Sequence, residues 1–166
     1  MNIATAFAAI MMMGFGADAA FAGPSGNTAQ QTVTCEVTPV NELAVSAPTA
    51  SLVVNSATAG SALNVVTDSS SSYSITTNGT ARVITGMLNA DMPEGVTLSI
   101  TLEAPSGAVS RGKQVLRATP VILVSGIQLL SEAGKAITYE LAATSAAGVV
   151  PSAIRTITLT IADGGG

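Results

Sequence analysis

The chain has 166 residues, of which 10% are charged and 3% aromatic, and its formal net charge is −4. This length points to one domain with short additions. Nucleic-acid binding is not expected, because it needs a basic patch and usually aromatic stacking platforms. The chain has no histidine and one cysteine, which excludes a Ser–His pair, a histidine-ligated metal and an intrachain disulfide.

Residues 1–22 are predicted to be a signal peptide. Residues 2–17 are uncharged and short for a membrane span, but they suit the apolar region of a secretory leader. Ala20-Phe21-Ala22 fits the small-residue cleavage pattern, and cleavage after Ala19 is the second option. No Lys or Arg precedes the apolar stretch, so a retained anchor is the alternative. The mature residues 23–166 contain no Phe, Trp or His, and no membrane span is expected there.

A flexible polar linker is expected over residues 23–31. Val33, Cys35 and Val37 then alternate with polar residues, which predicts a β-strand over Thr32–Thr38 that Pro39 ends. Ten further strand candidates follow in one domain that ends at residue 163, before a Gly tail over 164–166. They are Leu43–Ala47, Ser51–Asn55, Ala62–Thr67, Ser72–Thr77, Ala81–Leu88, Val96–Ala104, Gln114–Ala118, Val121–Ser125, Ala136–Thr144 and Ile154–Ala162.

Turn residues separate these candidates. Asn78-Gly79 predicts a hairpin. A two-residue turn would put Ile75 opposite Arg82. A three-residue turn puts Ile75 opposite Ala81 and Tyr73 opposite Val83, and it is favoured because it keeps apolar partners together. Pro93-Glu94-Gly95 predicts a tight turn. Residues 105–113 are expected to be the longest connection after this turn, and residues 127–135 to form at most one helical turn. Many short strands with regular turn signals predict an all-β, antiparallel β-sandwich of an Ig-like or pilin-like kind, with about 7–10 strands.

The N-terminal strand has two possible partners. It can pair within its own domain, or it can enter the sheet of a neighbouring subunit, where main-chain bonds give affinity and alternate side chains fill pockets. Val33, Cys35 and Val37 are the candidate interface residues of such a donor strand. Cys35 is expected to act as a small buried hydrophobe, with an intermolecular disulfide as the alternative.

Three of the six basic residues lie within a seven-residue segment: Arg111, Lys113 and Arg117. One interpretation is a solvated edge that discourages aggregation. The other is a docking patch for an acidic neighbour, including another copy of the chain. The acidic residues are scattered singly, and no phosphate-binding or calcium-binding motif is present. No catalytic residue, metal or cofactor is therefore expected, and an enzyme is not the favoured class.

The mature chain resembles bacterial pilus and fibre subunits of the donor-strand type, including the spore-coat-U-like pilins. The resemblance lies in the leader, the alternating segment QTVTCEV, the Ser/Thr/Ala/Val-rich body and a terminal strand with Thr156, Thr158 and Thr160. The segment DMPEGVTLSITL over residues 91–102 is also similar to segments of secreted bacterial proteins. The chain departs from these pilins in having one cysteine and no aromatic residue near its C-terminus.

The resemblance implies an exported structural subunit at the cell surface. Its partners would be copies of itself, joined by strand complementation into a pilus or filament, and an export or assembly factor is a further candidate. The alternative is a monomeric secreted or periplasmic module that binds a ligand or adheres to a surface. A hydrolase or lyase would need a converging pair of acids, which sequence cannot reveal.

Overall fold

The computed structural model describes residues 27–28, 30–47 and 49–165. The expected leader and most of the linker lie outside these residues. The chain divides into a unit that ends at Glu36 and a unit over residues 37–166. Residues 32–38 are exposed and carry no strand, in contrast to the expected strand. A lone extended segment has no partner for its backbone groups, which accounts for the difference.

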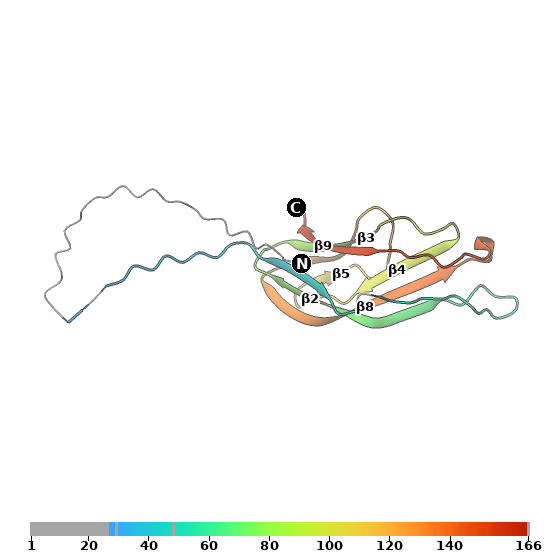
Figure 1. Ribbon diagram of the computed structural model, residues 1–166, viewed down its shortest axis with the longest axis horizontal. Coiled ribbons are helices and arrows are strands. Elements are labelled where there is room, and N and C mark those ends of the chain that lie inside the picture. Colours follow the sequence, from blue (N-terminus) through green and yellow to red (C-terminus); the bar gives the residue numbers. More distant parts are fainter. Residues whose placement is uncertain (1–26, 29, 48, 166) are drawn as a thin grey trace, which may run out of the picture. The chain divides into compact units, whose positions relative to one another are not determined.

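Nine strands are described, and all of their pairings are antiparallel (Figure 1). Strands β1, β2, β8, β4 and β6 form one sheet in that order, and β5, β7, β3 and β9 form the other. A short 3₁₀ turn covers Ser145–Ala147. The strand bounds are Asn41–Val45 (β1), Val66–Thr77 (β2), Arg82–Leu88 (β3), Val96–Leu102 (β4), Val109–Ser110 (β5), Gln114–Val115 (β6), Val121–Ile127 (β7), Leu130–Ala143 (β8) and Ile157–Asp163 (β9). The all-β class and antiparallel pairing are therefore confirmed.

Both sheets contribute to one hydrophobic core. In β4 the alternating residues Leu98, Ile100 and Leu102 are buried, and the intervening Ser99 is buried as well. From the other sheet, β3 and β7 contribute Ile84 and Leu123, which are fully buried. β9 differs, because its inward residues pack against the core but are only half-buried. Two antiparallel sheets thus share a core that is less complete beside β9.

The hairpin predicted at Asn78-Gly79 is wrong. β2 belongs to the five-stranded sheet and β3 to the four-stranded sheet, so the turn connects the two sheets. Ile75 lies opposite Leu43 and Glu132 in its own sheet, instead of Ala81. Ala81 adopts a left-handed backbone with φ of 53° on the way to β3. Because of this connection, the apolar faces of β2 and β3 pack into one core from two sheets. In a hairpin the two strands would instead lie side by side in the same sheet.

Three other local predictions were wrong. Residues 130–135 form the start of β8 instead of a helical turn, because their backbone pairs with the end of β2. The connection over residues 105–113 contains β5, which pairs with β7. No strand covers Ser51–Asn55. The tight turn before β4 is confirmed, with a left-handed Gly95 and a hydrogen bond from the Val96 N–H to the Pro93 carbonyl at 3.0 Å.

Candidate functional site

An apolar groove lies between the two sheets, next to strands β1 and β9. Its volume is about 730 Å³. Leu43 and Val45 of β1 line one side, and Ile157 and Leu159 of β9 line the other. The lining also includes inward residues of β4 and β8 and the loop segments 49–53 and 152–156. The groove therefore exposes part of the core between one edge of each sheet.

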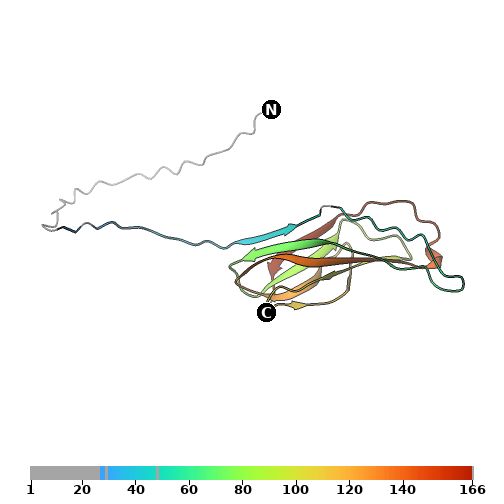
Figure 2. The same cartoon turned by 90° about the horizontal axis from the view of Figure 1, so that it is seen from below.

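Both strands beside the groove are edge strands. β1 pairs only with β2, and β9 only with β3, among the strands that the structure describes. Figure 2 shows β1 at the margin of its sheet beside β2. Each strand consequently has an outer row of N–H and C=O groups that no described strand pairs with. Such an edge is a template for one more strand.

The inward side chains of the two edges repeat every second residue. Leu43 and Val45 follow this interval on β1, as do Ile157 and Leu159 on β9. Val45 is 42% exposed although it lines the groove. An added strand would present side chains at the same two-residue interval, because successive residues of a strand point to opposite faces. The groove thus has the periodicity that an inserted strand requires.

Tyr139 of β8 is the aromatic residue of the groove lining. Burial raises the pKa of its phenol, and the negative charge of Asp68 adds to the effect. The phenol therefore stays neutral at physiological pH. Arg155 is the charged residue in the lining, and its Nε donates to the Asp91 carbonyl oxygen at 3.1 Å. The lining thus combines apolar side chains with Ser and Thr hydroxyl groups, one phenol and one guanidinium group.

The residues of the expected donor strand are exposed. Val33 is 70% and Val37 is 85% exposed. Cys35 is a free, exposed cysteine, so the expected burial of its side chain is not found in the single chain. Nothing in the segment covers the apolar face that the three residues form. The three side chains are therefore exposed in the single chain.

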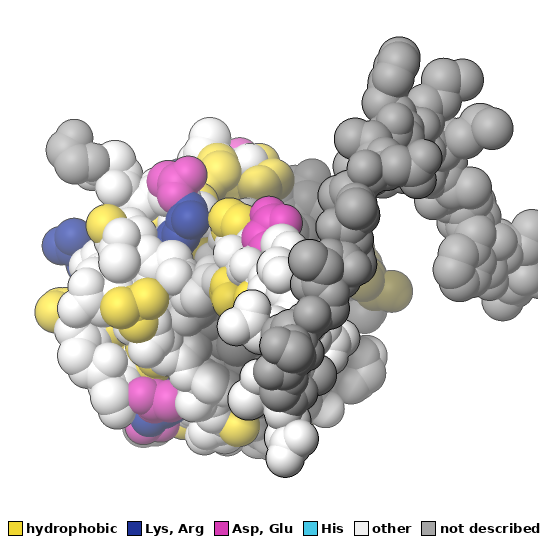
Figure 3. All heavy atoms as spheres, turned by 90° about the vertical axis from the view of Figure 1, so that its left-hand side faces the viewer, with side chains coloured by type: hydrophobic (Ala, Val, Ile, Leu, Met, Phe, Trp, Pro, Cys, Tyr) yellow, Lys and Arg dark blue, Asp and Glu magenta, His cyan; other side chains and the backbone are white. Residues whose placement is uncertain are grey.

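The three cations of the expected docking patch are exposed in the segments that precede and follow β6. Lys113 pairs with Glu140 at 2.9 Å, whereas Arg111 and Arg117 form no ion pair with a described residue. None of the three lines the groove. Figure 3 shows a surface with few, scattered charged side chains on the face it views. The structure therefore does not bring the cations and the groove together.

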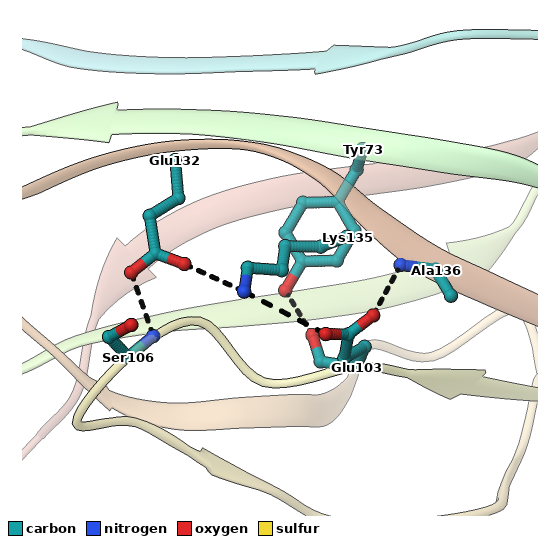
Figure 4. Close-up of polar contacts among 6 residues, drawn as sticks. All are labelled: Tyr73, Glu103, Ser106, Glu132, Lys135 and Ala136. Carbon is teal, nitrogen blue, oxygen red and sulfur yellow. Dashed lines mark hydrogen bonds and ion pairs between the residues drawn. The ribbon is translucent and has the colours of Figure 1, made fainter.

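A polar cluster attaches the loop after β4 to β2 and β8 (Figure 4). Tyr73, which is buried, donates its hydroxyl to the Glu103 carbonyl oxygen at 2.6 Å. Burial raises the pKa of Tyr73 far above its usual value, with the negative charges of Glu103 and Glu132 adding to the effect. The phenol therefore remains a hydrogen-bond donor at all ordinary pH values. Its role is to anchor the loop.

The carboxylates of this cluster bind a lysine and backbone amides. Glu132 accepts a bond from the Ser106 N–H at 2.9 Å and pairs with Lys135 at 2.8 Å. Glu103 accepts from the Ala136 N–H at 3.0 Å. The pKa of Glu132 is lowered to about 2, first by its bond with Lys135 and then by those from Ser106. A carboxyl held ionised in this way fixes a loop and is poorly suited to donate a proton.

We expect Tyr73→Phe to lower the free energy of unfolding by about 1 kcal/mol, because a buried hydrogen bond is lost. Tyr139→Phe is the matched control, since its hydroxyl forms no hydrogen bond with a described residue, and we expect a loss below about 0.5 kcal/mol. Urea unfolding of both variants measures the difference. Equal losses would contradict the anchoring role of Tyr73.

Comparison with protein-family models, curated proteins and solved structures finds no match for the chain. No helix in the described part of the chain is long and apolar enough to cross a membrane. No group of three or more Cys, Asp and Glu side chains within residues 27–28, 30–47 and 49–165 is arranged to hold a metal ion.

Sequence reasoning missed the groove. It predicted strands close to β1 and β9, but it could not place them as the neighbouring edges of two sheets. The alternation of Ile157, Leu159 and Ile161 with threonines identified β9 as a strand with one apolar face. No sequence signal showed that part of this face remains uncovered.

Proposed function

We propose that the chain is an exported structural subunit that assembles with copies of itself into a pilus or filament at the cell surface. Residues 32–38 of one subunit act as a donor strand that enters the groove of the next. The observation that supports this proposal most is the apolar groove of about 730 Å³ between the unpaired edges of β1 and β9. In this account the two sheets form a β-sandwich that the donated strand completes.

The donor and the groove are complementary in chemistry. Val33, Cys35 and Val37 lie on one face of an extended chain, with roughly 13 Å between the first and the last residue. Their apolar side chains would lie among the inward residues of β1 and β9. The backbone of the donor would pair with one of the unpaired edges. Thr34 and Glu36 would face solvent.

The positions of the two parts favour an open chain of subunits. The chain begins β1 at Asn41, beside Thr77, at the end of the domain where β9 finishes. The groove is lined by the end of β1, the start of β9 and the loops that follow and precede them. The segment directly before β1 thus joins the domain near one end, and the groove-lining parts of β1 and β9 lie toward the other. Repetition of such a head-to-tail contact gives a filament.

The size of the groove also supports a second candidate function, a monomeric module that binds a small apolar ligand. Small-molecule pockets typically span about 300 to 1,000 Å³ and are mostly apolar. The two candidates differ in what fills the groove. They are separated by whether the chain is a polymer or a folded monomer.

We expect residues 23–166 to form polymers and residues 41–166 to remain monomeric. The shorter chain contains all nine described strands but no donor. Size exclusion with light scattering measures the mass of each, and circular dichroism shows whether the shorter chain folds. A folded monomer of residues 23–166 would contradict the filament proposal and favour the ligand-binding module.

A further inference from the structure

Asn78 connects the end of β2 with the residues that precede β1. Its backbone N–H donates to the Val40 carbonyl oxygen at 3.2 Å. Its side-chain Oδ1 accepts from the Val40 N–H at 2.7 Å, and its Nδ2 donates to the Thr38 carbonyl oxygen at 2.8 Å. A side-chain amide offers the same donor and acceptor as a peptide group. Asn78 therefore extends the β1–β2 ladder beyond the pair of Asn41 and Thr77.

These bonds hold residues 38–40 in line with β1. No turn or bend is assigned over these three residues. To reach the outer edge of β1 in the same chain, residues 32–38 would have to reverse direction just before Asn41. The reversal would move Thr38 to the side of β1 that faces away from β2 and Asn78. The bond from Asn78 to Thr38 and a reversal at this point therefore exclude each other.

Preventing the reversal matters because a tethered strand competes strongly with a free one. A segment joined to its own groove by a few residues is present at an effective concentration on the order of millimolar. The donor strands of other chains, at micromolar concentration, would rarely displace it. Donation between chains consequently needs a feature that disfavours insertion into the groove of the same chain.

We propose that Asn78 is a positioning residue that directs residues 32–38 away from the groove of their own chain and thereby makes strand donation intermolecular. This inference rests on the proposed function and adds how insertion within one chain is avoided. It also assigns Asn78 a role other than that of a hairpin turn residue, which is the role that the sequence predicts.

The test compares wild-type residues 23–166 with Asn78→Ala, both refolded from urea at the same concentration. We expect the polymer fraction to fall about tenfold in the variant, because two side-chain hydrogen bonds that oppose the reversal are lost. The new monomer should bury Cys35 in its own groove, so its thiol should resist a maleimide reagent. A purely structural role of Asn78 would not protect Cys35.

Two further variants complete the design. Asn78→Asp keeps the acceptor for Val40 and loses the donor to Thr38, so we expect an intermediate polymer fraction. Ser131→Ala removes a hydrogen bond between β8 and Thr76 without touching residues 38–41, and we expect wild-type assembly. Wild-type polymer yield from Asn78→Ala, or a variant monomer with a reactive Cys35, would overturn the role of Asn78 alone. A wild-type chain that does not polymerise would overturn the proposed function as well.

Discussion

Replacing Val33 and Val37 together with aspartate is expected to abolish self-assembly of residues 23–166. Burial of the two valines in a neighbour's groove would contribute about 3 to 6 kcal/mol, so its loss should weaken the proposed contact more than a hundredfold. Both side chains are exposed in the single chain, so the fold of the domain should not change. Light scattering should report the mass of a monomer. Circular dichroism should give the spectrum of the wild-type domain.

The control for this variant places the same charges on the other face of the segment. Thr32→Asp with Thr34→Asp adds two carboxylates that would face solvent in the donated strand, and assembly should persist. If the control loses assembly as fully as the valine variant, charge and not burial is responsible. If the valine variant still polymerises, residues 32–38 are not the donor.

Val45→Asp is expected to block assembly from the other side of the contact. Val45 lines the groove, and a carboxylate there would be buried without a partner once a strand enters. Such a burial costs several kcal/mol, which weakens the contact by roughly a hundredfold. In the monomer the side chain at this position is 42% exposed, so the stability of the single domain should change little.

Val115→Asp is a close match for that variant. Val115 is also 42% exposed and lies on β6, the opposite edge of the same five-stranded sheet. It does not line the groove. Sedimentation velocity at equal concentration should show polymers for Val115→Asp and monomers for Val45→Asp. Equal behaviour of the two variants would show that the edge of β1 is not the site of assembly.

Local pattern predicted β3, β4, β7 and β9 closely, whereas the equally long alternation over residues 32–38 forms no strand in the single chain. Leu98, Ile100 and Leu102 are buried as their spacing predicts, although Ser99 between them is buried as well. The errors occurred where distant segments decide the local structure. Residues 130–135 form a strand only because the end of β2 lies beside them. The turn at Asn78-Gly79 joins two sheets, and Asn78 bonds to residues about 40 positions earlier in the chain, which a local pattern does not reveal.

The candidate site could be predicted only in part. The alternation of Val33, Cys35 and Val37 predicts a strand with one apolar face, which is the donor in our proposal. The position of the groove is determined by the strand order. Leu43 and Ile157 are far apart in sequence, and they line the same groove because β1 and β9 are edge strands of the two sheets. Sequence periodicity identifies the apolar face of a strand but does not determine which strands remain at an edge.

Mixing the two assembly-deficient variants tests the central claim most directly. The Val33→Asp/Val37→Asp chain keeps an intact groove, and the Val45→Asp chain keeps an intact donor. Each alone should be monomeric, and their mixture should form a complex of twice the monomer mass that grows no further, with Cys35 of the Val45→Asp chain protected from maleimide. A mixture that remains monomeric, or a complex in which both Cys35 thiols stay reactive, would contradict donation of residues 32–38 into the groove between β1 and β9.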